Sequence, residues 1–166
     1  MQTIHPMLWF DTQAEEAANR YVSIFPNSKL GRVERYGPGA PQPEGTVMTV
    51  EFFLDGQQFV ALNAGPEFTF NESISFVVPC ESQAEVDKFW DKLVDGGEPS
   101  YCGWLKDRYG VSWQVTPTVL TEMLSDPDPE KSKRVFEAMM KVVGKFEIDD
   151  LKAAYEGRIP QPAGRA

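Results

Sequence analysis

MLWFDTQAEE (residues 7–16) has a counterpart later in the chain, ISFVVPCESQAEV (residues 74–86). Each stretch begins with an extended apolar segment and continues into a QAE triplet, at positions 13 and 83. Apolar residues then recur at spacings of three and four as far as about Phe25 in the first copy and Val94 in the second, which is typical of a helix with one buried face. The chain therefore contains an internal repeat that begins with a strand and a helix.

Strand patterns follow each predicted helix. In the first copy they cover 29–36, 46–54 and 58–62, with Asp55-Gly56 as a hairpin turn between the last two. In the second copy they cover 99–102, 104–106 and 112–116. Proline and glycine in 37–45 predict a loop that only the first copy has. The sequence thus predicts an α+β fold made of two tandem βαβββ modules with curved mixed sheets.

The remaining residues are predicted to be helical and to form an addition to the modules. Helices are expected at 118–124, from 128 or 130 to about 143, and at 148–155. We expect a single domain (1–166) composed of module one (1–66), module two (67–117), a C-terminal helical extension (118–158) and a flexible tail (159–166).

Composition excludes several classes of partner. The 166 residues carry a formal net charge of −9, which opposes nucleic acid phosphates and anionic membranes. Two cysteines without CxxC spacing are expected to be free thiols. The sequence has neither a secretion signal nor an apolar stretch long enough to span a membrane, so it predicts a cytoplasmic protein.

Ordered motifs give the chain a family resemblance. They are Leu8-Trp9-Phe10-Asp11, Asn63-Ala64-Gly65-Pro66, Phe70-Asn71-Glu72, Cys102-Gly103-Trp104-Leu105-Lys106-Asp107 and Ser112-Trp113-Gln114. With these motifs, the duplicated βαβββ unit resembles the PhnB-like branch of the vicinal-oxygen-chelate superfamily, which includes glyoxalases, bleomycin-resistance proteins and extradiol dioxygenases. The resemblance implies sheets that curve around a cavity, a homodimer, and, for many members, the label 3-demethylubiquinone 3-O-methyltransferase.

No cofactor is predicted, although S-adenosylmethionine and a divalent metal stay open as alternatives. A conventional S-adenosylmethionine site has a glycine-rich turn after the first strand, whereas the turn here, 10–13, has no glycine. By resemblance, Gln114 occupies the position of a metal-binding Glu, and a neutral amide is the poorer ligand for a divalent cation. A metal-dependent glyoxalase- or dioxygenase-like lyase using His5, Glu51 and Glu72 is the remaining alternative.

Catalytic residues are not identified, but a candidate pocket is. Aromatic rings on strands suit a flat or apolar ligand, and a few polar groups can orient it. Cys102 is a further candidate because a thiolate can act as a nucleophile. The candidate pocket residues are Trp9, Glu51, Asn63, Asn71, Cys102, Trp104, Trp113 and Gln114. The predicted function is that of a metal-free, aromatic-lined small-molecule pocket, with the methyltransferase and the metal-dependent lyase as alternatives.

Overall fold

A computed structural model describes residues 4–158, so the predicted tail at 159–166 lies outside the described residues. The chain divides into two compact units, the first ending at Phe70 and the second beginning at Asn71. Each unit has its own sheet and its own helices, and the two are described separately.

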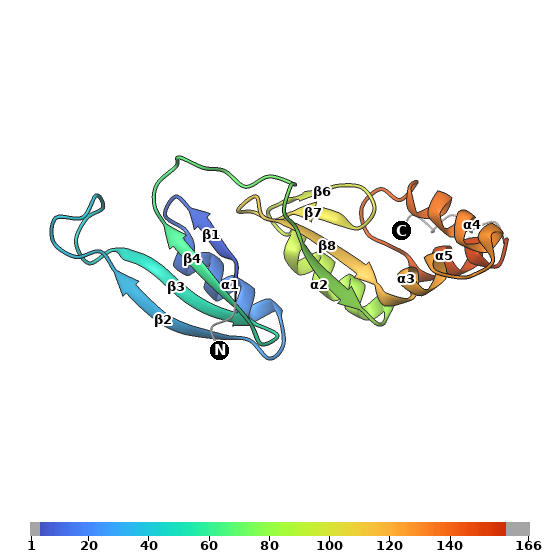
Figure 1. Cartoon of the computed structure of the whole chain (residues 1–166), viewed down its shortest axis with the longest axis horizontal. Helices are drawn as coiled ribbons and strands as arrows, with labels where there is room; N and C mark the ends of the chain where they lie inside the picture. The colour runs from blue at the N-terminus through green and yellow to red at the C-terminus, as the bar shows by residue number, and fades with distance from the viewer. Residues whose placement is uncertain (1–3, 159–166) are drawn as a thin grey trace. The chain divides into compact units, whose positions relative to one another are not determined.

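The first unit is a βαβββ module. It consists of β1 (Met7–Phe10), α1 (Ala14–Ile24), β2 (Lys29–Arg35), β3 (Val47–Leu54) and β4 (Gln57–Asn63). The strand order is β1-β4-β3-β2, with β1 parallel to β4 and the other pairs antiparallel. Helix α1 lies against one face of this sheet (Figure 1), where its Tyr21 ring stacks on Phe52 of β3 at 6.0 Å.

The second unit repeats this topology. It contains β5 (Phe76–Cys80), α2 (Gln83–Val94), β6 (Glu98–Pro99), β7 (Trp104–Lys106) and β8 (Ser112–Pro117), in the strand order β5-β8-β7-β6. Strand β5 is parallel to β8, as β1 is to β4. Two mixed sheets of identical topology confirm the predicted α+β fold.

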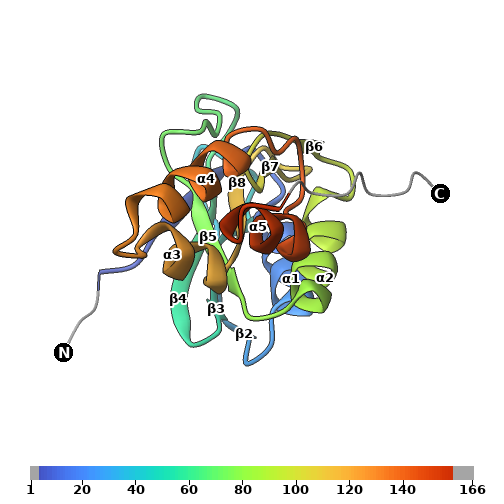
Figure 2. The same ribbon diagram turned by 90° about the vertical axis from the view of Figure 1, so that its right-hand side faces the viewer.

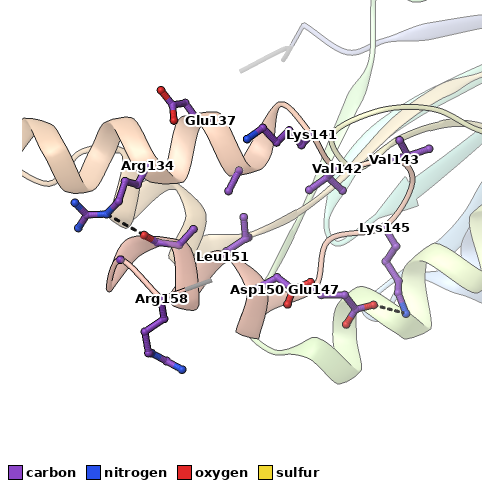
Figure 3. A pocket seen from close by; sticks show the side chains of 13 residues that line it. Arg134, Glu137, Lys141, Val142, Val143, Lys145, Glu147, Asp150, Leu151 and Arg158 are labelled. Carbon is purple, nitrogen blue, oxygen red and sulfur yellow. Dashed lines mark hydrogen bonds and ion pairs between the residues drawn. The ribbon is translucent and has the colours of Figure 1, made fainter. Parts of the chain in front are cut away.

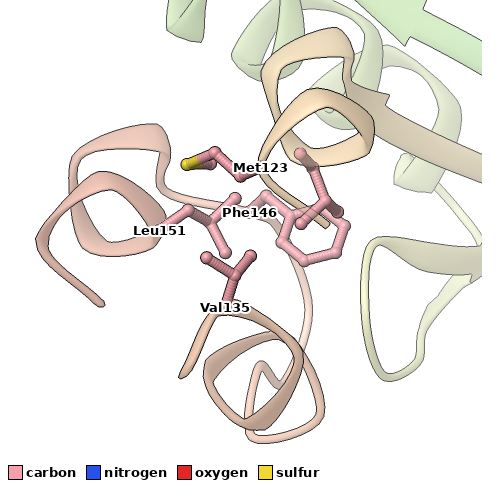
Figure 4. Packing of buried hydrophobic residues seen from close by; sticks show 5 residues of the cluster. Met123, Val135, Phe146 and Leu151 are labelled. Carbon is pink, nitrogen blue, oxygen red and sulfur yellow. The ribbon is translucent and has the colours of Figure 1, made fainter. Parts of the chain in front are cut away.

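Three helices continue from β8 and belong to the second unit. They are α3 (Thr118–Leu124), α4 (Pro129–Met139) and α5 (Ile148–Tyr155), which pack on one another (Figure 2). Their shared core is formed by one residue from the loop before α5 and four from the helices (Figure 4), namely Leu120, Met123, Val135, Phe146 and Leu151. The extension therefore has an apolar core of its own.

Three elements differ from the sequence predictions by two or more residues at one end. Strand β5 begins at Phe76 instead of the predicted Ile74, because its pairing with β8 begins with Phe76 and Trp113. Strand β6 covers only Glu98–Pro99. Helix α4 ends at Met139, four residues before the predicted end, because the chain after it pairs with 100–103: the Cys102 N–H donates to the Val142 carbonyl at 3.0 Å, and the Gly144 N–H to the Ser100 carbonyl at 2.7 Å.

None of the helices within residues 4–158 is long and apolar enough to cross a membrane.

Candidate functional site

The sheet of the second unit has one face that its own helix α2 does not cover. Strand residues alternate between the two faces, and Val78 and Val115 are buried on the α2 side. The strand register places Val77, Gln114 and Trp104 in one row on the opposite face. An aromatic ring and a carboxamide thus lie next to each other on a surface free of helices within that unit.

A second row crosses the same face one step further along. It consists of Glu98, Lys106 and Ser112, which the register pairs across β6, β7 and β8. Beside this row is a hollow of about 120 Å³, whose lining also includes Ser100, Trp104 and Glu72. The Ser112 side chain is only 2% exposed, and its hydroxyl has no hydrogen-bond partner among the described residues. This hollow therefore contains a buried polar group that is left unsatisfied.

The hollow is lined by three charged side chains, Lys106, Glu72 and Glu98. The Lys106 ammonium is 2.5 Å from the Glu72 carboxylate, and this hydrogen bond lowers the pKa of Glu72 below its ordinary value. Glu98 neighbours Lys106 on β6. The lining thus includes one cation and two carboxylates, so it has a net negative charge at neutral pH.

The sheet of the first unit also has a helix-free face, and Glu51 of β3 lies on it. A β-bulge between Leu30 and Val33 leaves the Arg32 N–H free to donate to Glu51 Oε2 at 3.2 Å. Gln58 Nε2 donates to Glu51 Oε1 at 2.6 Å. A Cβ on Gly31 would come within 2.5 Å of the same carboxylate, so a larger residue here would displace the Glu51 side chain. The bulge, the glycine and Gln58 together fix the position of Glu51.

Trp9 is the aromatic residue of this first-unit face. Its register partner on β4 is Leu62, and its indole N–H donates to the Gly65 carbonyl at 2.9 Å. Its ring makes an edge contact with Phe68, with ring centroids 4.9 Å apart. Trp9 and Glu51 therefore lie on one sheet face of the first unit.

Two predicted pocket residues lie on the helix-covered faces instead. Asn63, 9% exposed, accepts a hydrogen bond from the Ala14 N–H at 2.8 Å and donates to the Val47 carbonyl at 3.1 Å. Trp113, 3% exposed, donates its indole N–H to Asp107 at 2.9 Å. In each case the polar atoms take part in hydrogen bonds that organise the unit's own core.

Cys102 and Asn71 occupy connecting segments. The Cys102 thiol contacts the Met139 carbonyl at 3.3 Å, and its backbone pairs with the segment after α4. At the adjacent Gly103, φ is 76° and a Cβ would lie 2.5 Å from the Phe146 ring, so this turn docks closely on the extension. Asn71 forms a turn by accepting hydrogen bonds from Ser73.

A further hollow of the second unit, with a volume of about 600 Å³, lies on the extension between α4 and α5 (Figure 3). Its apolar lining includes Val142 and Leu151, and its rims carry side chains of both charges. Several of these are already engaged: Arg134 donates to the Ala154 and Tyr155 carbonyls, and Lys145 pairs with Glu147. The hollow shows no preference for one sign of charge.

We tested how the residues present fit the cofactors that the fold family implies. Residues 4–158 contain no group of three or more His, Cys, Asp or Glu side chains that could hold a metal ion. His5 is exposed, and the Gln114 amide nitrogen donates to the Ser75 hydroxyl at 2.8 Å. At the turn after β1, Ala14 is fully buried and its N–H is bonded to Asn63, so this turn does not fit the glycine-rich loop of a conventional S-adenosylmethionine site.

Several solved structures are similar to this chain. A structure from Bacillus cereus, provisionally named a 3-demethylubiquinone-9 3-methyltransferase and PhnB protein, is 37% identical over 70% of this chain and 100% of its own, with a TM-score of 0.65. A Pseudomonas aeruginosa protein (21% identity, 70% and 98% coverage, TM-score 0.58) and the fosfomycin resistance protein FosX from Mesorhizobium loti (11%, 75% and 98%, TM-score 0.53) share the fold. No curated protein matches the sequence.

The class is therefore defined by the fold that the Bacillus cereus PhnB protein and FosX also have. The family model described as 3-demethylubiquinone-9 3-methyltransferase matches residues 2–116, and the chain belongs to that PhnB-like family. Helices α3 to α5 begin at Thr118 and so lie beyond the matched residues.

Sequence reasoning missed Lys106 and Ser112. A signal for both was present, because they alternate with Trp104 and Gln114 along two predicted strands and must share a face with them. The burial of Ser112 without a hydrogen-bond partner, by contrast, has no signal in the local sequence pattern.

Proposed function

We propose that the protein binds a flat, largely apolar small molecule on the helix-free face of the second unit's sheet, without a catalytic metal. The observation that carries this proposal is the juxtaposition of Trp104 and Gln114 in one row of that face. An indole offers a broad apolar surface, and a carboxamide beside it can orient a polar substituent. Membership of a family named after a ring-containing substrate supports the same ligand class.

The direct test is calorimetric titration with 2,3-dimethoxy-5-methylphenol, a ring probe without reactive groups. Wild type is expected to bind it saturably, and Trp104→Ala to weaken binding by at least about fivefold through loss of the ring contact. Phe136→Ala is the matched control, because Phe136 is an exposed ring on α4 of the same unit. Absence of saturable binding, or equal affinity of wild type and Trp104→Ala, contradicts the proposal.

The metal-free part of the proposal rests on Gln114, a neutral amide where a carboxylate ligand is expected by resemblance. Native mass spectrometry combined with elemental analysis tests it. We expect protein without stoichiometric metal; one tightly held transition metal ion per subunit contradicts this and favours the lyase alternative. The same spectra test the proposed homodimer, which requires a mass of about twice 18.7 kDa. The cytoplasmic location stays a prediction.

A second candidate function is methyl transfer to a demethylubiquinone-like phenol. It is favoured by the matching family model and by the name of the Bacillus cereus relative, although the turn after β1 is closed by Asn63. Titration with S-adenosylmethionine distinguishes the two candidates. Micromolar affinity favours the methyltransferase, whereas absence of a heat signal favours a binding protein or an enzyme of another kind.

A further inference from the structure

The Ser112 hydroxyl is the one buried side-chain polar atom within residues 4–158 that has no hydrogen-bond partner. An unsatisfied buried hydroxyl destabilises the folded state, because its hydrogen bonds with water are lost and nothing replaces them. Native proteins keep few such groups, and each requires an explanation, such as an ordered water, a bound molecule or a catalytic role. At Ser112 the space for a bound group is present, since this residue lines the 120 Å³ hollow beside Trp104.

We infer that this hollow is a subsite for a neutral oxygen acceptor of the ligand, namely a ketone or quinone carbonyl attached to a ring that lies against Trp104. The Ser112 O–H and an N–H of Lys106 are the donors. Lys106 has three N–H donors, of which the Glu72 contact occupies one. This assignment rests on the proposed function and adds the polar group that the ligand must carry.

Charge decides between a neutral and an anionic acceptor. A carboxylate or phosphate entering the hollow would gain from Lys106 but would also face Glu72 and Glu98, which line the same hollow. With two carboxylates and one ammonium, the lining already has a net negative charge, which repels an anion over these short distances. A carbonyl oxygen accepts the same hydrogen bonds without that repulsion.

Volume sets the size of the group that enters. A water molecule needs about 10–15 Å³ of such space, so a hollow of about 120 Å³ has room for several waters. A carbonyl with the carbons attached to it fits this space. Trp104 also lines the hollow, so a ring attached to that carbonyl can lie against its indole.

A matched pair of probes tests the carbonyl. 3,4-Dimethoxyacetophenone carries it, and 4-ethyl-1,2-dimethoxybenzene has the same ring and nearly the same shape without it. Dissociation constants from ligand-observed NMR are expected to favour the ketone in wild type. Ser112→Ala and Lys106→Met should each weaken ketone binding about 5- to 10-fold, the effect of one hydrogen bond, and leave the ethyl compound within twofold. Ser125→Ala and Lys88→Met are the controls, because neither residue lines the hollow.

Thermal unfolding separates recognition from a structural role. Ser112→Ala removes an unsatisfied hydroxyl, so its melting temperature is expected to equal or exceed that of wild type. The carbonyl subsite is overturned if wild type binds the two probes with equal affinity. It is also overturned if Ser112→Ala and Lys106→Met weaken the binding of both probes equally. Either result leaves the proposed function standing. If wild type binds neither probe and also fails to bind the phenol, both proposals are overturned.

Discussion

The two βαβββ units share one topology but fix the start of their helices differently. In the first unit α1 begins after Gln13, and the buried Ala14 N–H is satisfied by Asn63, a residue of β4 that lies 49 positions away. In the second unit α2 is capped locally: the Ser82 hydroxyl accepts from the Glu85 N–H, and the Glu85 carboxylate accepts from the Glu81 N–H. The repeated QAE triplet therefore predicts where the helices lie, but the hydrogen bonds that cap their first turns are not repeated.

The turn before the last strand differs in the same way. In the first unit Asp55 and Gly56 both have positive φ values, 46° and 80°, as a tight two-residue hairpin requires. In the second unit Asp107, 4% exposed, accepts hydrogen bonds from the Tyr109 N–H, the Val111 N–H and the Trp113 indole. One turn depends on backbone conformation and the other on a buried carboxylate, so equivalent substitutions should have unequal effects.

The largest effect is expected for Asp107→Ala. It leaves three donors without their acceptor, one of them the buried Trp113 indole, and each unsatisfied donor costs about 1–3 kcal/mol. We expect a loss of about 3–5 kcal/mol in the free energy of unfolding, measured in urea. In the first unit Asp55→Ala is the matched change and should cost only about 1–2 kcal/mol, because its main consequence is to place alanine at a positive φ. Similar losses for the two variants would remove the contrast between the turns.

Asn63→Ala should have the next largest effect. The Ala14 N–H and the Val47 carbonyl both lose their partner, and Ala14 has no exposed surface at which water could replace it. The free energy of unfolding is expected to fall by about 2–3 kcal/mol, because buried polar groups are again left unsatisfied. Hydrogen exchange of the Ala14 amide should accelerate in this variant. Slow exchange there would mean that the long-range cap is dispensable.

Ser82→Ala tests the local cap of the second helix. The bond from the Glu85 N–H is 3.3 Å long and exposed, so water can take the place of the hydroxyl. We expect a loss of about 1 kcal/mol, the usual cost of removing a serine N-cap. A loss as large as that of Asn63→Ala would show that the two caps contribute alike.

The repeated topology could be predicted from sequence because local patterns indicate it, namely the apolar spacing, the QAE triplets and the Asp55-Gly56 turn. Residues whose role depends on distant partners were harder to interpret. Asn63 and Trp113 looked like pocket residues, yet their hydrogen bonds to Ala14 and Asp107 place them on helix-covered faces. Ser112 was missed because its burial arises from tertiary structure. Trp104 and Gln114 were both among the predicted pocket residues, and strand register alone makes them neighbours on adjacent strands.

The smallest expected effect concerns an ion pair that has no equivalent in the first unit. Asp87 of α2 binds Lys145 at 2.5 Å, whereas the residue seventy positions earlier is the buried Ala17. The hydrogen bond from Lys145, followed by one from Gln83, lowers the pKa of Asp87, and the bond to Asp87 raises the pKa of Lys145. The pair joins α2 to the segment that leads into α5.

These shifts fix the pH window of the contribution. A lowered Asp pKa stabilises the fold above the ordinary value near 3.8, and this stabilisation is lost as pH falls through the folded-state value. A raised Lys pKa stabilises the fold below 10.5, and this is lost as pH rises through the folded-state value. Both side chains are partly exposed, 43% and 28%, so solvent screening limits the effect to about 1 kcal/mol or less.

We therefore expect Asp87→Asn to be less stable than wild type by a constant amount between pH 6 and 9, with the difference shrinking below about pH 4 and in 0.5 M salt. Urea unfolding across this pH range measures it, and Lys145→Met should lose a similar amount in the same window. In the double variant the two losses should not add, because they report one interaction. Additive losses, or a difference that persists at pH 3, would show that each residue acts through other contacts. The anchoring of α2 to the extension would then rest on the Gln83 contacts with Phe146 and Ile148 instead.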